Sequence, residues 1–162
     1  MTFENIRIKK VNSIIRYKSN VKKWSVKSRH HHFVGIKLDG SSYHNFGYHD
    51  FVLSRNKVYF FNQKDDYEVE AYEAGDSFSV HFTTYEDIET ESFCVAVENS
   101  DEFIALLQKA ETLSKLKGRE DLDLLATLYK LCSLLSHMRE KAYAPRNDRM
   151  LAAREYIDLH FT

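Results

Sequence analysis

Eight histidines in 162 residues are the side chains of this sequence best suited to chemistry. Three of them are consecutive, in the segment RHHHF at 29–33. A barrel that binds a catalytic metal typically offers two histidines two residues apart on one strand, a carboxylate soon afterwards, and another histidine from a second strand. His30 and His32 have this spacing and His81 could be the third ligand, so a small metal-dependent enzyme is one hypothesis.

The carboxylate that a metal site needs is missing from this segment. FVGIKLDG follows the histidines, and its first acid, Asp39, falls at an expected turn. Nucleophile motifs are absent as well, because there is no Gly-x-Ser-x-Gly elbow and no glycine-rich phosphate loop. The sequence therefore favours a protein that is not an enzyme, and neither a metal nor another cofactor is expected.

A small-molecule cavity is the second use for these side chains. His32 shares strand parity with Val34 and Ile36, so it should point inward, where its imidazole needs either a core partner or a ligand. Aromatic residues on a barrel strand fill the core or line a cavity. The candidate effector-binding residues are His32, His44, Tyr59, Phe61, Tyr67 and His81.

The elements that must position these residues are expected to be strands. Alternation with period 2 is clearest in HFVGIKL at 32–38 and in DSFSVHFT at 76–83. Glycine, asparagine and aspartate mark turns between such segments from Ile6 to about Val97. Six to eight strands spaced about ten residues apart predict a sandwich or barrel, and the short connections predict antiparallel pairing.

The period changes to that of a helix after Val97. Ser100 precedes DEFIALLQKAETLSKL, with acids in the first turn, and a second helix is expected over 119–143. The second helix carries a heptad seam, which favours a homodimer through this helix. The alternative is a helix wedged between the sheet and the first helix of its own chain. The seam residues are Leu124, Leu128, Leu131, Leu135 and Met138.

Charge and cysteine usage set the broad class of the protein. Between Asn5 and Leu38 there are ten Lys or Arg and no acid, whereas Asp65 to Gln108 contains thirteen acids and no Lys or Arg. Solvated edges of one fold explain this better than direct nucleic-acid contact, since the net charge is −1.

Cys94 and Cys132 lie in apolar segments typical of reduced thiols. MTFENIRIKK lacks the apolar run of a secretory signal, so a cytoplasmic protein without membrane contact is expected.

The last segment follows Pro145, the only proline in the sequence. NDRMLAAREYIDLHFT at 147–162 has helical periodicity, with Asp148 as a capping residue, yet no further element follows it for packing. At this point the chain resembles the AraC-type transcriptional regulators. HHHFVGIKLDGSSYHNFGYHDFVLSRNKVYFFN and YEAGDSFSVHFT are similar to parts of that family's barrel, and LAAREYIDLHFT looks like the first helix of its DNA-binding region. Asn56 stands where the family commonly has glycine.

The resemblance implies a cupin-like double-stranded β-helix followed by two antiparallel α-helices. Residues 1–98 would be an effector-sensing barrel, 99–143 a helical dimerisation module, and 144–162 a linker with the first helix of a truncated helix-turn-helix domain. An unknown small-molecule effector would shift the arrangement of barrel and helices, and DNA would be bound only through the missing C-terminal domain. The alternatives are a small metal-dependent cupin enzyme that uses His30, His32 and His81, and a side-chain-filled barrel that only mediates assembly.

Overall fold

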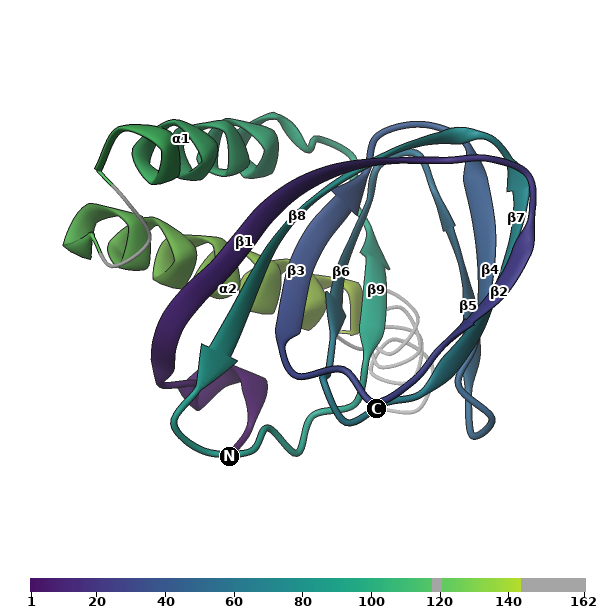
Figure 1. The fold of residues 1–162 in the computed structure, drawn as a ribbon, viewed down its shortest axis with the longest axis horizontal. Coiled ribbons are helices and arrows are strands. Elements are labelled where there is room, and N and C mark those ends of the chain that lie inside the picture. The colour runs from purple at the N-terminus through teal and green to yellow at the C-terminus, as the bar shows by residue number, and fades with distance from the viewer. Residues whose placement is uncertain (118–120, 144–162) are drawn as a thin grey trace, which may run out of the picture.

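A computed structural model describes residues 1–117 and 121–143 of the chain (Figure 1). The expected linker at Pro145 and the expected helix at 147–162 lie outside the described residues. The described chain is mainly antiparallel β structure followed by two helices, so the predicted fold class is confirmed. Its elements are a short 3-10 helix η1 (Phe3–Asn5), β1 (Ile8–Ser19), β2 (Lys23–Val26), β3 (His32–Lys37), β4 (Ser41–Asn45), β5 (Asp50–Ser54), β6 (Lys57–Phe61), β7 (Tyr67–Glu73), β8 (Gly75–Thr84), β9 (Phe93–Ala96), α1 (Asp101–Lys117) and α2 (Leu122–Tyr143).

The strands form two sheets that face each other. The five-stranded sheet has the order β1-β8-β3-β6-β9 and the four-stranded sheet has the order β2-β7-β4-β5. Every strand pair is antiparallel, as the short connections predicted. The described residues contain nine strands, more than the six to eight expected; β2 and β4 have only four and five residues.

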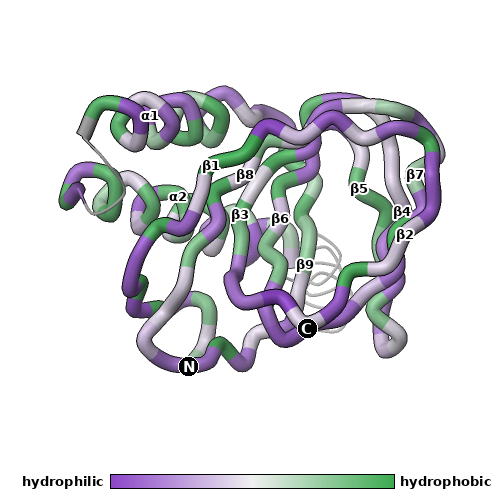
Figure 2. Tube along the Cα trace, in the orientation of Figure 1, coloured by the Kyte–Doolittle hydropathy of each residue, from purple (hydrophilic) through white to green (hydrophobic). Residues whose placement is uncertain are grey.

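The main hydrophobic core lies between the five-stranded sheet and the helices. Figure 1 shows α1 and α2 running in opposite directions along this side of the sheet. Even-numbered positions of β3 and β8 face the helices, as the alternation in the sequence predicted; Val34, Ile36, Phe78, Val80 and Phe82 are all fully buried. Apolar residues continue onto β6 and β9, which Figure 2 shows in green. Neither helix of the described chain has the length and hydrophobicity that a membrane span requires.

The heptad seam of α2 packs into this core rather than against a second chain. Leu124, Leu128, Leu131 and Leu135 have no exposed surface in the single chain, and Met138 packs partly buried beside them. The prediction that this seam forms a dimer interface is therefore corrected, and the alternative of a helix wedged within its own chain applies. Surface that is already buried against the sheet and α1 cannot be buried a second time by a partner.

Side chains cap the start of each helix. The Asp121 carboxylate accepts hydrogen bonds from the backbone N–H groups of Asp123 (2.9 Å) and Leu124 (3.3 Å), which begins α2. At α1 the capping oxygen belongs to Asn99, which accepts from the N–H of Asp101 at 2.8 Å. Ser100, the expected cap, instead donates its hydroxyl to Asn56 on the loop between β5 and β6. This bond ties the start of the helical region to the sheet.

Candidate functional site

A cavity of about 370 Å³ lies between the two sheets. Its lining residues come from β1 to β8 and from the segment that leads into β3. On β1, Ile15 and Tyr17 line it and remain 37% and 43% exposed, so the cavity opens beside this strand. A volume of this size, with mainly apolar walls and a few polar groups, is typical of small-molecule sites.

The odd-numbered positions of β3 and β8 form the cavity wall of the five-stranded sheet. Phe33 and Lys37 reach into the cavity from β3, opposite the even positions that face the helices. Gly35 lies between them, and a Cβ at this position would come within 2.7 Å of the Tyr59 hydroxyl and 2.6 Å of the Phe78 carbonyl oxygen. The glycine therefore lets the Tyr59 ring lie across the strand.

Lys37 and His44 lie at one end of the cavity, and both are buried. Lys37 is 2% exposed, and its Nζ donates to the Ser19 hydroxyl at 3.3 Å. His44 is 7% exposed, with Nε2 3.0 Å from the Ser42 hydroxyl and Nδ1 buried without a partner. Burial lowers the pKa of Lys37, and burial together with the Lys37 charge lowers the pKa of His44 to about 3. At neutral pH this end therefore holds a neutral imidazole beside a poorly solvated amine.

Arg29 closes the other end of the cavity. Its guanidinium donates to the backbone carbonyl oxygens of Asn62 and Asp65. It also lies 4.7 Å from the ring centre of Phe33 and 5.0 Å from that of Tyr67, which are cation–π distances. Burial lowers the pKa of Arg29, and Tyr67 and Asp65 oppose this shift. Arg29 thus joins the loop after β6 to the aromatic wall.

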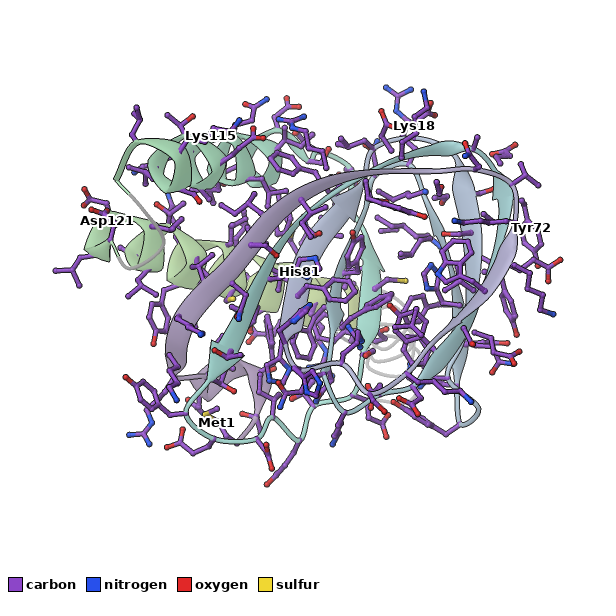
Figure 3. All side chains as sticks on the ribbon, in the orientation of Figure 1. Met1, Lys18, Tyr72, His81, Lys115 and Asp121 are labelled. Carbon is purple, nitrogen blue, oxygen red and sulfur yellow. The ribbon has the colours of Figure 1, made fainter. Side chains whose placement is uncertain are left out.

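His81 lies beside Arg29, and Figure 3 shows it in the interior of the molecule. Its Nε2 is 3.0 Å from the Ser79 hydroxyl, while its Nδ1 is buried without a partner. The ring stacks on Phe33 at 4.8 Å and lies at the same distance from His31. Burial is the main reason that the pKa of His81 is lowered to about 3, so the imidazole is neutral at physiological pH.

Aromatic rings connect the two polar ends. The ring centres of Tyr59 and Phe61 are 5.2 Å apart, and those of Phe61 and Tyr67 are 5.1 Å apart. Burial raises the pKa of Tyr67 to about 12 and also raises that of Tyr59, so both phenols stay neutral. These rings offer a flat apolar surface to any molecule in the cavity.

Five of the six candidate effector-binding residues line the cavity: His44, Tyr59, Phe61, Tyr67 and His81. The sixth, His32, does not. It points inward as expected, but its inward side is the core under the helices, where its ring lies 5.9 Å from Phe60 and 5.7 Å from Phe82. Its Nδ1 accepts from the backbone N–H of Gln63 at 3.1 Å and its Nε2 lies 3.3 Å from the Thr84 hydroxyl. His32 is therefore a satisfied core histidine, which was the alternative interpretation.

The proposed metal set of His30, His32 and His81 does not come together. His32 and His81 lie on opposite faces of the five-stranded sheet, and His30 is exposed. Residues 1–117 and 121–143 contain no group of three or more His, Cys, Asp or Glu placed to hold a metal ion. His30 precedes β3, which begins at His32, so these two histidines do not lie along one strand, and His81 is on the opposite face of the sheet from His32.

Sequence reasoning missed the cations and hydroxyl groups of the site. Lys37, Arg29 and His31 line the cavity, as do serines of β1, β4 and β8. Lys37 has the parity opposite to Val34 and Ile36, which in a sheet with one buried face would place it in solvent. One signal in the sequence could have predicted this. The segment with strand character is long enough to form a second sheet, and a second sheet would cover the face that carries Lys37.

The comparisons with known proteins identify solved structures of the same fold. No family model matches the chain, and no curated protein matches it. The chain is similar to ToxT from Vibrio cholerae O395, at 10% identity and a TM-score of 0.52, over 84% of this chain and 58% of that one. A second ToxT structure gives 7% identity and 0.52, over 91% and 65% of the two chains.

The AraC-like transcriptional activator CuxR is also similar, at 12% identity and a TM-score of 0.50, over 90% of this chain and 59% of that one. The chain therefore spans less than two thirds of the length of each of these solved proteins. The chain thus shares its fold with an AraC-like transcriptional activator, so the resemblance stated from the sequence is confirmed at the level of the fold.

Proposed function

We propose that this chain is the effector-sensing part of an AraC-type transcriptional regulator. The observation that carries the proposal is the cavity of about 370 Å³ between the sheets of a fold shared with ToxT and CuxR. A barrel that served only for assembly would have a side-chain-filled interior, whereas this one has room for a small molecule. DNA binding would belong to the intact regulator and to a region outside the described residues.

The five-stranded sheet supplies a physical route from the cavity to the helices. On β1, Ile15 and Tyr17 face the cavity, while Arg16 between them forms an ion pair of 3.2 Å with Glu111 of α1. The Arg16 guanidinium also lies 4.0 Å from the ring centre of Phe78, in the core under the helices. A ligand that moves β1 would therefore change the contacts between β1 and α1. The ligand would then bind the two arrangements of sheet and helices with different affinity, which is what a shift in their populations requires.

A homodimer through α2 remains part of the proposal, on a different surface from the seam. The outward side of this helix carries Leu122 and Tyr143, which are 80% and 68% exposed, and Leu116 at the end of α1 is 77% exposed. Exposed apolar side chains of this size are common at interfaces.

Ligand binding can be tested with N-phenyl-1-naphthylamine, a neutral aromatic probe that fluoresces in apolar surroundings. We expect saturable binding of one probe per chain, because the cavity is apolar and aromatic. At a free concentration of about 100 Kd the free energy of unfolding should rise by about 2.7 kcal/mol. Hydrogen exchange should slow in β1 and α1, and mass spectrometry would measure this.

Two tryptophan variants on β5 distinguish the cavity from the outer surface. Leu53 is 3% exposed and lines the cavity, whereas its neighbour Val52 is 39% exposed. Leu53→Trp should fill the cavity and abolish probe binding, while Val52→Trp should leave it unchanged. The proposed function would be contradicted if both variants bound the probe equally. It would also be contradicted if the probe slowed hydrogen exchange only in the four-stranded sheet.

A further inference from the structure

The ligand cavity has cations but no anions. Lys37 and Arg29 line it, and among the described residues of its wall none is Asp or Glu. Asn and Gln are also missing from that wall. Sugars and other polyhydroxyl ligands are normally held by such carboxylate and amide groups, which accept and donate hydrogen bonds together. The composition of the wall therefore favours a ligand with a negative charge and few hydroxyl groups.

The two cations differ in their burial and in the groups that surround them. Arg29 is half-buried and stacks on aromatic rings; its Nη2 donates to two backbone carbonyl oxygens, while its Nε and Nη1 have no hydrogen-bond partner. Lys37 is 2% exposed, the ion pairs of the described chain do not include it, and its hydrogen bond goes to the neutral Ser19 hydroxyl. A buried ammonium without a counter-charge is strongly unfavourable. Asp76 and Asp39 favour the charged form of Lys37 electrostatically, but neither forms an ion pair with it, so Lys37 has no carboxylate in direct contact.

The surroundings of Lys37 suit an anionic headgroup. Ser42 supplies a hydroxyl group at this end of the cavity, and the neutral His44 ring has an unpartnered Nδ1 there. Beyond this end lie the rings of Tyr59, Phe61 and Tyr67, which can hold a flat apolar group. The polar region around Lys37 therefore adjoins the aromatic region of the wall.

We propose that the cavity takes an amphiphilic ligand with one anionic group, carboxylate, sulfonate or phosphate, bound by Lys37, and an apolar body that packs against the aromatic rings. This inference rests on the proposed function, because it specifies the chemical class of the effector. The ligand supplies an anionic group in direct contact with Lys37, so part of its affinity comes from an amine that is already desolvated before binding.

Two probes with the same aromatic body test the inference. 8-Anilinonaphthalene-1-sulfonate carries a sulfonate, and N-phenyl-1-naphthylamine is the same body without it. We expect the wild-type chain to bind the sulfonate probe more tightly. Lys37→Met keeps the length of the side chain and removes the charge. It should therefore lower the affinity for the sulfonate probe by about 10- to 100-fold, which corresponds to the loss of a charge-assisted hydrogen bond. Binding of the neutral probe should change by less than about twofold.

Lys18→Met is the matched control. Lys18 is on β1 beside Ser19, but it is exposed and projects from the edge of the molecule in Figure 3. This variant has the same net charge as Lys37→Met and should bind both probes like the wild type. Equal loss of sulfonate binding in the two variants, or no loss in either, overturns the inference and leaves the proposed function standing if the neutral probe still binds. Saturable binding of neither probe overturns both. A melting temperature at or above that of the wild type shows that Lys37→Met is folded.

Discussion

Acidification should unfold this chain between about pH 6 and pH 4, because three histidines are buried in their neutral form. Burial lowers the pKa of His32 to about 4 and those of His44 and His81 to about 3. In the unfolded chain these groups titrate near the ordinary value of 6.5. Below that pH the unfolded state binds more protons than the folded state, so stability is complete above pH 6.5 and is lost as the pH falls.

The expected loss is large relative to the stability of a domain. Each histidine contributes about 1.4 kcal/mol per pH unit in this window, and the three together about 4 kcal/mol per pH unit. Domains of this size are stable by about 5–15 kcal/mol, so about two pH units remove much of the total. Urea titrations followed by circular dichroism at half-unit steps of pH would measure the slope.

His44→Gln should reduce that slope by about one proton and shift the unfolding midpoint to lower pH. Glutamine retains an amide that can hydrogen bond with the Ser42 hydroxyl. His137→Gln is the control, because His137 lies on the exposed surface of α2. An acid midpoint of His44→Gln identical to that of His137→Gln would show that His44 does not resist protonation in the folded chain.

Leu131→Ala should destabilise the single chain by about 2–5 kcal/mol. Leu131 has no exposed surface and belongs to the cluster that joins α2 to the five-stranded sheet. Truncation removes buried methyl groups and leaves a cavity that the packed elements on either side cannot fill. Equilibrium unfolding in urea would measure the change, at two protein concentrations that differ by about 50-fold.

Leu122→Ala is the matched control for this substitution. It removes the same atoms from the same helix, but Leu122 is 80% exposed in the single chain, so at the lower protein concentration the change should be within about 0.5 kcal/mol. Because Leu131 packs within its own chain, the loss in Leu131→Ala should be the same at both protein concentrations. A loss that disappears at the higher concentration would mean that the seam is buried by a second chain after all.

Local patterns were sufficient to predict the elements and the fold class. Alternation in HFVGIKL and DSFSVHFT identified β3 and β8, together with the buried face of each, because side chains on a strand alternate between its two faces. Apolar residues three and four positions apart identified α1 and α2, because such residues share one face of a helix. The pattern also selected five of the residues that line the cavity, since histidines and aromatics within strands must pack against something.

Tertiary structure decided what each face packs against. Alternation shows that His32 and Val34 share a face, but not whether that face meets the helices or the cavity; the position of α1 and α2 over this side of the sheet settles it. The same placement buries the leucine seam of α2 within one chain, and the four-stranded sheet converts the opposite face, with Lys37 on it, from a solvent surface into a cavity wall. Periodicity records only how residues within one element are related. The partner of each face depends on contacts between residues far apart in the sequence, and these are formed only when the chain is folded.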